Sequence, residues 1–233
     1  MIAGDARVYV IGDIHGRLDL LARMVEMINL DIQSRGGENL IVTLGDYIDR
    51  GPSSRGVLDC LLSNPFAGRY IALKGNHEVL LEAFLENPTV GVDWWRLGGR
   101  ETLKSFGVKA KPRMMGTHFE RLAVQLSAAL SLQQREFLGS LKTSLVVGRY
   151  FLCHAGVRPG IALELQSEDD LLWIREEFLD SQLDFGKIVV HGHTPVPAPQ
   201  VKANRINIDT GAFATGHLTC VVLEDDKHRF IST

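Results

Sequence analysis

Five short polar motifs carry the residues of this sequence that could do chemistry, and each follows an apolar run typical of a β-strand. They combine carboxylate, amide and imidazole side chains. Such a set suits borderline to hard divalent ions such as Mn, Fe, Zn or Mg, and no cysteine lies among them. In open α/β sheets, sites form where strands end, so all five motifs can line one pocket. The motifs are residues 12–16 (GDIHG), 45–51 (GDYIDRG), 75–78 (GNHE), 154–156 (HAG) and 191–194 (HGHT).

Six side chains of these motifs are candidate metal ligands. Asp13 and His15 are two residues apart, so at a strand end their side chains can point the same way. Asp46 offers two carboxylate oxygens and can bridge two cations. Six ligands with one bridging carboxylate are enough for two ions ~3.5–4 Å apart, an arrangement that generates hydroxide from bound water and clamps a phosphoryl group. The candidate ligands are Asp13, His15, Asp46, Asn76, His154 and His193.

The first half of the chain alternates strand and helix patterns, which places the first three motifs. β-Branched and aromatic runs predict strands at residues 7–12, 39–44 and 69–73, and apolar residues at helical spacing predict a helix after each strand. This alternation implies a parallel sheet with right-handed crossovers.

The rest of the chain departs from this alternation. Residues 86–117 contain several Gly, Pro and Trp residues and are expected to form an irregular excursion or cap. Two helices are expected at 119–130 and 132–141, the second with a capping box formed by Ser131 and Gln134. Residues 145–153 read as a β-hairpin, and further strands are expected at 187–190, 205–208 and 218–223. Because no linker divides the chain, we expect one domain over 1–233, with 86–143 as a helical or irregular cap insertion.

Composition narrows the class of protein. The 233 residues are 45% hydrophobic and 23% charged, which is ordinary for a soluble globular protein. The net charge of −3 gives no basic excess, so no nucleic-acid partner is expected. No apolar run reaches the ~18–20 residues that span a bilayer, and the short run at 8–11 does not resemble a signal peptide. Three scattered cysteines, Cys60, Cys153 and Cys220, are expected to be buried thiols in a reducing cytoplasm.

The order and spacing of the five motifs resemble the calcineurin-like dinuclear metallophosphoesterases. More narrowly, the chain resembles the phosphoprotein phosphatase family of serine/threonine phosphatases, in its bacterial and phage branch. The resemblance runs from about Val8 to Thr219. It implies an α/β fold of two packed mixed β-sheets flanked by helices, with the metals at one sheet edge.

The resemblance also implies a role for each ligand. Asp13, His15 and Asp46 would hold the first metal, and Asp46 would bridge to the second. Two divalent ions, with Mn expected first and Fe, Zn or Mg as alternatives, would carry a bridging hydroxide that attacks phosphorus directly. The other ligands of the second metal would be Asn76, His154 and His193.

Four further residues receive roles from the same resemblance. His77 would be the general acid that protonates the leaving alkoxide, a role worth ~10²–10⁴ in rate, and Asp49 would orient it. Arg50 would bind the phosphate oxygens through its planar guanidinium, and the Asn76 amide could also donate to the phosphate. Arg175 is a second candidate phosphate clamp, with a solvated arginine paired to a nearby Glu as the alternative.

The expected reaction is hydrolysis of phosphoserine and phosphothreonine in a phosphoprotein or phosphopeptide. One alternative is a symmetrical diadenosine tetraphosphate hydrolase, which shares the fold and the metals. The intact Asp49–Arg50 pair and a third motif ending in Glu78 favour the protein phosphatase. A non-catalytic module is a second alternative, but every expected position is filled.

Three other residues, two of them in the motifs, have a structural interpretation beside the functional one. His191 is expected to lie behind the ligands rather than among them. Glu78 either hydrogen-bonds a ligand or begins a helix, and Asp209 is expected to be structural. Pro195 stands where many other metallophosphoesterases have a further ligand histidine, which is also the pattern of the phosphoprotein phosphatases.

Overall fold

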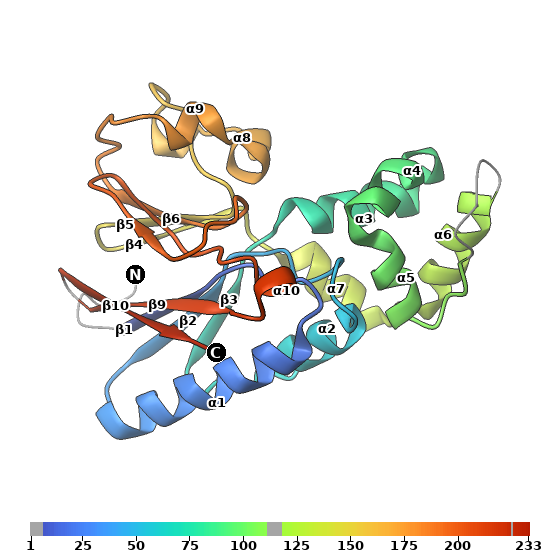
Figure 1. Ribbon diagram of the computed structural model, residues 1–233, viewed down its shortest axis with the longest axis horizontal. Helices are drawn as coiled ribbons and strands as arrows, with labels where there is room; N and C mark the ends of the chain where they lie inside the picture. The colour runs from blue at the N-terminus through green and yellow to red at the C-terminus, as the bar shows by residue number, and fades with distance from the viewer. Residues whose placement is uncertain (1–6, 111–117, 225) are drawn as a thin grey trace.

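A computed structural model describes residues 7–110, 118–224 and 226–233 (Figure 1). In this described part, the strands form two mixed sheets of five, as expected. The first sheet has the order β10-β9-β1-β2-β3, with β1 (Arg7–Ile11), β2 (Asn39–Thr43), β3 (Arg69–Ala72), β9 (Thr219–Glu224) and β10 (Lys227–Ser232). The second has the order β4-β5-β6-β8-β7, with β4 (Ser144–Val147), β5 (Tyr150–Cys153), β6 (Ile188–His191), β7 (Gln200–Val201) and β8 (Arg205–Asn207).

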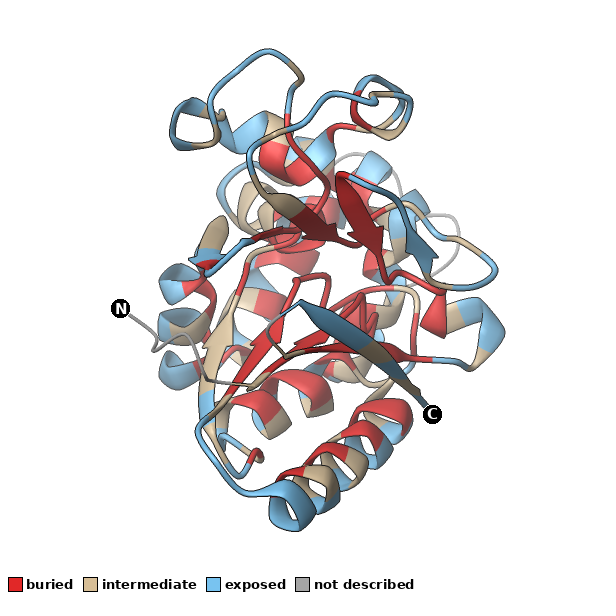
Figure 2. Ribbon diagram, turned by 90° about the vertical axis from the view of Figure 1, so that its left-hand side faces the viewer, coloured by how far each residue is buried: buried red, intermediate tan, exposed pale blue. Residues whose placement is uncertain are grey.

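Strand alternation explains why the two sheets stack. In β1, Val8 and Val10 face a core shared with the second sheet, whereas Tyr9 and Ile11 face the helices. In β5, Leu152 likewise faces the first sheet. Such strands are buried on both faces and read as continuous apolar runs rather than as alternating ones. Figure 2 shows the inner strands buried in both sheets and β10 largely exposed.

Within each sheet, three neighbouring strands are parallel: β1, β2 and β3 in the first, and β5, β6 and β8 in the second. The remaining strands pair antiparallel: β9 and β10 follow on one side of β1, and β4 and β7 form the two edges of the second sheet. The carboxyl ends of the parallel strands therefore lie together at one side of each sheet, which is where the polar motifs leave the strands.

Helices cover the outer faces of both sheets. The apolar stripe of α1 (Leu18–Arg35), with Leu21, Met24 and Ile28, packs in the same core as Tyr9. The second sheet is covered by a small region of η3 (Leu163–Leu165), α8 (Glu168–Trp173) and α9 (Glu176–Leu179). The other helices are α2 (Ser54–Leu62), α3 (Asn76–Glu86), η1 (Pro88–Val90), α4 (Gly91–Trp94), η2 (Trp95–Gly99), α5 (Arg100–Ser105), α6 (His118–Ala129), α7 (Leu132–Ser140) and α10 (Ala212–Thr215).

The expectation of an irregular excursion at 86–117 is wrong for most of its length, because residues 88–105 are almost continuously helical. Two of its glycines serve close packing rather than helix termination. A Cβ on Gly91 would lie 2.5 Å from the Phe119 ring, and one on Gly99 would lie 2.4 Å from the Trp94 ring. Residues 111–117 lie outside the described part.

One smaller sequence prediction is confirmed, and others differ from the structure. The capping box of Ser131 and Gln134 at the start of α7 is confirmed. Strand β10 was not predicted, because its side chains are mostly exposed and show no apolar pattern. All three cysteines are free thiols; Cys153 and Cys220 are buried, but Cys60 is only half-buried. None of the described helices has the length and apolar character needed to cross a membrane.

Candidate functional site

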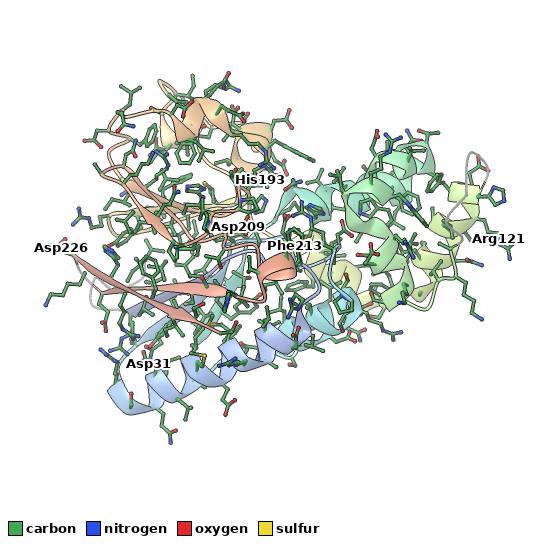
Figure 3. The ribbon with its side chains drawn as sticks, viewed as in Figure 1. Asp31, Arg121, His193, Asp209, Phe213 and Asp226 are labelled. Atoms are coloured by element: carbon green, nitrogen blue, oxygen red, sulfur yellow. The ribbon has the colours of Figure 1, made fainter. Side chains whose placement is uncertain are left out.

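The motif residues gather where the two sheets meet, at the carboxyl ends of six strands. The loops after β1, β2 and β3 come from the first sheet, and those after β5, β6 and β8 come from the second. Figure 3 shows His193 and Asp209 close to Phe213 of α10 at this junction, whereas Asp31, Arg121 and Asp226 lie at distant edges. The six candidate metal ligands are all buried in this place.

The first group of ligands joins His15 and Asp46. His15 Nδ1 lies 2.9 Å from the carbonyl oxygen of Ile48, which can only accept, so Nδ1 carries the proton. The unprotonated Nε2 then faces Asp46 Oδ2 at 3.3 Å. The Asp13 carboxylate lies within 4.8 Å of an Asp46 oxygen and a His154 ring nitrogen, and it accepts the backbone N–H of His193 at 3.1 Å. These side chains present oxygen and nitrogen lone pairs to a shared space.

The second group has the same character. His154 Nδ1 donates to the Leu44 carbonyl at 3.0 Å, which leaves Nε2 unprotonated. This Nε2 lies 2.9 Å from Asn76 Oδ1 and 3.4 Å from Asp46 Oδ1. His193 Nδ1 lies 2.9 Å from the same Asn76 oxygen and 3.2 Å from His154 Nε2. Asp46 therefore contributes one oxygen to each group.

The charge state of these side chains fits divalent cations. Burial lowers the pKa of His15 to about 3 and that of His193 to about 2, so both imidazoles are neutral at physiological pH. Burial also raises the pKa of Asp13, and the neighbouring carboxylates of Asp209 and Asp46 raise it further. Crowded carboxylates repel one another unless a cation lies between them, and the unprotonated nitrogens of neutral imidazoles offer lone pairs to such a cation. The residues present therefore fit two metal ions that share Asp46.

Backbone strain is concentrated at the same place. In the described part, six residues other than glycine have a positive φ, and five of them belong to the motifs. Such conformations persist only where the surroundings hold them, and they cluster at functional sites. The five are His15, Asp46, Asp49, Arg50 and His193, with φ between 45° and 71°.

Glu78 is one of the groups that hold this backbone. It is fully buried, and its carboxylate accepts the N–H groups of Asp46 at 2.8 Å, Tyr47 at 2.9 Å and Gly75 at 2.9 Å. Burial, together with the charge of Asp46, raises the pKa of Glu78 to about 8. Glu78 thus joins the second motif to the third. The sequence suggested either a hydrogen bond to a ligand or the start of a helix, and Glu78 does both, because it bonds to the backbone of Asp46 and also caps α3.

His77 and Asp49 form a hydrogen-bonded pair beside the ligands. His77 Nδ1 donates to Asp49 Oδ2 at 2.7 Å, and Asp49 is completely buried. Burial alone would lower the pKa of His77, but the charge of Asp46 and the hydrogen bond to Asp49 raise it. Two residues that sequence reasoning did not assign also contact Asp49: the Trp94 indole at 2.9 Å and the Thr102 hydroxyl at 2.5 Å.

Arg50 lies on the open side of His77. Its Nη2 donates to His77 Nε2 at 3.2 Å, and its guanidinium stacks over the Phe213 ring at 4.6 Å. The same ring meets His15 edge-on at 5.4 Å. Phe213 was not predicted to take part, because no motif surrounds it. The only signal in the sequence is its place four residues after Asp209.

Arg175 reaches the opposite side of the ligands. It precedes α9 instead of lying within a helix, and its Nη1 donates to Thr194 Oγ1 at 3.4 Å, next to His193. Its positive charge contributes to the lowered pKa of His193. Of the other motif residues, His191 packs on the Phe178 ring at 4.9 Å and faces away from the ligand groups. The Asp209 carboxylate accepts the N–H of Gly211 at 2.9 Å, at the start of α10.

Two hollows lie near the site, one lined in part by Arg50 and the other in part by Arg175. The hollow next to Arg50 has a volume of about 700 Å³ and is lined by Leu18, Pro52 and Phe213, among others. The hollow next to Arg175 has a volume of about 510 Å³. Its lining holds the carboxylates of Asp169, Asp170, Glu176 and Glu177 against the guanidinium groups of Arg158 and Arg175.

A helix-flanked double sheet with candidate metal ligands at its strand ends is the arrangement expected of a metal-dependent phosphoesterase. Comparison with known families agrees: the model of the calcineurin-like phosphoesterases matches residues 6–218. The chain therefore belongs to the calcineurin-like phosphoesterase family, and it is a phosphoester hydrolase.

Individual relatives divide between two substrate classes. Serine/threonine-protein phosphatase 2 of Salmonella typhimurium, strain LT2, is 29% identical over 222 residues, covering 91% of this chain and 90% of that protein. An asymmetrical bis(5′-nucleosyl)-tetraphosphatase of Anoxybacillus flavithermus, strain DSM 21510 / WK1, is 25% identical and covers 91% and 88%. A crystal structure named as that of a candidate diadenosine tetraphosphatase superposes with a TM-score of 0.68 at 20% identity, over 100% of this chain and 96% of that one, and supports the fold alone.

Proposed function

We propose that this protein hydrolyses phosphoserine and phosphothreonine in phosphoproteins, with two divalent ions held by the strand-end ligands. The observation that carries the proposal is the buried pair of His77 and Asp49, joined at 2.7 Å beside Arg50. The alkoxide of serine or threonine is a poor leaving group and needs a proton from a positioned acid. The phosphate leaving group of a nucleoside polyphosphate needs this help far less.

Each side chain of the site has a defined task in this proposal. His77 Nε2 delivers the proton to the leaving oxygen, and Asp49 keeps the proton of the ring on Nδ1 and fixes the ring plane. Arg50 leaves His77 Nε2 and binds the phosphate through its planar fork, which frees that nitrogen for the substrate. Arg175 binds the phosphate from the other side, and the Asn76 amide N–H₂ donates to it.

The metal ions would be held by two ligand sets that share Asp46. Asp13, His15 and Asp46 form the first, and Asp46 with Asn76, His154 and His193 forms the second. When bound, the two ions activate a water at neutral pH and neutralise charge on the phosphoryl oxygens. The mixed oxygen and imidazole donors suit manganese, with Fe, Zn or Mg as alternatives.

We also propose that residues 1–233 form one catalytic domain, in which 86–143 are an insertion. This is supported by the shared core, because Trp94, Leu103 and Leu122 of that segment pack in the same cluster as Tyr9 of β1.

A cytoplasmic location is supported by three free thiols, which suit a reducing compartment.

The test is phosphate release by the metal-stripped protein after Mn, Mg, Zn or no metal is restored. A phosphoserine peptide and diadenosine tetraphosphate would be compared at equal concentrations, with Asp46→Asn as the inactive control. Manganese-dependent release from the peptide, with little cleavage of the nucleotide, is expected. Cleavage of the nucleotide alone would overturn the substrate class and leave the metal centre in place.

A nucleoside polyphosphate is the second candidate substrate, and one feature favours it. The exposed part of the Phe213 ring lies beside Arg50 at the mouth of the 700 Å³ hollow, where a base could stack while its phosphates face the guanidinium. The hollow near Arg175 opposes this candidate, because its four carboxylates outnumber its two guanidinium groups. A phosphate chain running that way would meet net negative charge.

A further inference from the structure

Two of the side chains that donate hydrogen bonds to the Asp49 carboxylate come from a segment that contains none of the five motifs. Asp49 Oδ2 accepts the indole N–H of Trp94 at 2.9 Å as well as Nδ1–H of His77 at 2.7 Å. Its other oxygen, Oδ1, accepts the Thr102 hydroxyl at 2.5 Å. Trp94 ends α4 and Thr102 lies in α5. They lie 45 and 53 positions after Asp49 in the sequence, yet both donate a hydrogen bond to its carboxylate.

Proton accounting fixes the direction of these hydrogen bonds. A carboxylate only accepts, so the single proton of the Thr102 hydroxyl is committed to Asp49 Oδ1. The lone pairs of the same hydroxyl then accept the backbone N–H of Asp49 at 2.9 Å and the hydroxyl proton of Ser54 at 3.0 Å. Thr102 therefore contacts both the side chain and the backbone of Asp49, and it shares the backbone N–H with Ser54 Oγ, which accepts it at 3.1 Å. If the Thr102 hydroxyl turned toward another acceptor, Asp49 Oδ1 would lose its donor.

The backbone at Asp49 needs such support. Asp49 and Arg50 both have a positive φ, 71° and 63°, which costs free energy in residues other than glycine. The same helical segment holds Arg50 as well, because the carbonyl of Gly98 accepts the Arg50 N–H at 3.3 Å. Gly98 itself has a φ of 116°, and a Cβ there would lie 2.5 Å from that nitrogen.

We infer that Thr102 and Trp94 are positioning residues for the general acid, acting through Asp49. If the Thr102 hydroxyl is lost, Oδ1 becomes a buried carboxylate oxygen without its donor, and Asp49 can turn away from His77. The His77 ring would then lose the fixed plane and tautomer that protonation of a leaving group requires. This inference rests on the proposed function of His77, but it concerns any phosphomonoester that has a poor leaving group.

The test compares Thr102→Val, which keeps the shape and removes the hydroxyl, with Thr102→Ser, which keeps the hydroxyl. Phenyl phosphate, with a poorer leaving group, and p-nitrophenyl phosphate, with a good one, are the substrates. Thr102→Val is expected to lower kcat on phenyl phosphate about 10–100-fold and on p-nitrophenyl phosphate less than about 3-fold, with KM unchanged. Thr102→Ser should restore kcat on phenyl phosphate to within about 3-fold of the original protein.

Two further variants separate positioning from general destabilisation. Ser105→Ala removes a hydroxyl from the same helix, where Ser105 bonds to the Thr102 carbonyl at 2.9 Å without touching Asp49, and kcat on both substrates should stay unchanged. Trp94→Phe keeps an aromatic ring and removes the N–H, and it should reproduce the selective loss on phenyl phosphate. Melting temperature and bound metal are measured for every variant.

The outcomes separate this inference from the proposed function. Equal losses on both substrates, no loss on either, or a Thr102→Ser variant as impaired as Thr102→Val would overturn the positioning role. If the original protein hydrolyses both aryl phosphates but not a phosphoserine peptide, the proposed substrate class is wrong, while the comparison of the variants still decides the role of Thr102.

Discussion

The carboxylate of Asp13, at the end of β1, accepts the backbone N–H of His193, which follows β6, at 3.1 Å. This hydrogen bond joins one ligand of the first sheet to one of the second. The close approach requires glycine at the preceding position, because a Cβ on Gly192 would lie 2.1 Å from Asp13 Oδ1. The metal ligands are thus divided between the two packed sheets, at the edge where this hydrogen bond joins them.

Removal of the metals is therefore expected to weaken the packing of the two sheets. In the absence of cations, the carboxylates of Asp13, Asp46 and Asp209 face one another in a buried space. A ligand present at 100 times its dissociation constant stabilises the folded state by about 2.7 kcal/mol. Melting curves with a chelator and with excess Mn should differ by several degrees. A midpoint that does not respond to metal would contradict the proposed ligand sets.

Replacement of His77 by Asn should affect substrates according to their leaving groups. Turnover of a phosphoserine peptide should fall by ~10²–10⁴, because the alkoxide loses its proton donor. Turnover of p-nitrophenyl phosphate should fall far less, since nitrophenolate leaves without help. Steady-state kinetics on both substrates measures the contrast, and bound metal serves as the control. Equal losses on the two substrates would argue against a general acid.

Replacement of Glu78 by Gln should destabilise the protein although the shape is kept. The three backbone N–H groups that its two oxygens accept cannot all be accepted by an amide, whose N–H₂ would face one of them. We expect a loss of about 1–3 kcal/mol in the free energy of unfolding, measured by denaturant titration of the metal-free protein at about pH 9, where Glu78, whose pKa is about 8, is ionised. Glu82→Gln, on the same helix, is the control, and a loss as large there would refute a specific role for Glu78.

Acid stability should depend on Asp31, far from the site. The Asp31 carboxylate accepts the Tyr9 hydroxyl at 2.6 Å and also pairs with Arg229 and Arg35. Burial alone would raise the pKa of Asp31, but the bonds to Tyr9 and Arg229 lower it. The stabilisation is therefore present above the unfolded pKa, near 3.9, and is lost as pH falls through the lower folded value.

Asp31→Asn tests this pH dependence. The variant should be less stable than the original protein at pH 6, and the difference should shrink as pH falls below about 4. Chemical denaturation at several pH values gives the two free energies. A difference that stays constant down to acid pH would show that the charge of Asp31 contributes nothing.

The fold could be predicted where local pattern and tertiary role agree. The doubly buried strands β1, β2 and β5 are apolar runs, and the motifs after them stand out as polar residues at strand ends. The segment around Trp94 and Thr102 was predicted to be irregular because its glycines suggest a loop. In the structure, these glycines allow close packing of helices instead. The contacts of Trp94 and Thr102 with Asp49 depend on how distant elements dock, and no local spacing encodes them.

The pairing of β1 with β9 bears on how the protein is made. Residues 8–11 bond on one side to β2 and on the other to residues 220–223, near the opposite end of the sequence. A nascent chain emerging from the ribosome can thus pair β1, β2 and β3 early, but β1 keeps an open edge until residues 220–223 have been synthesised. The ligands His154 and His193 also arrive late. A complete set of the six candidate ligands therefore exists only after His193 has emerged from the ribosome, so the full metal centre cannot assemble on the first half of the chain alone.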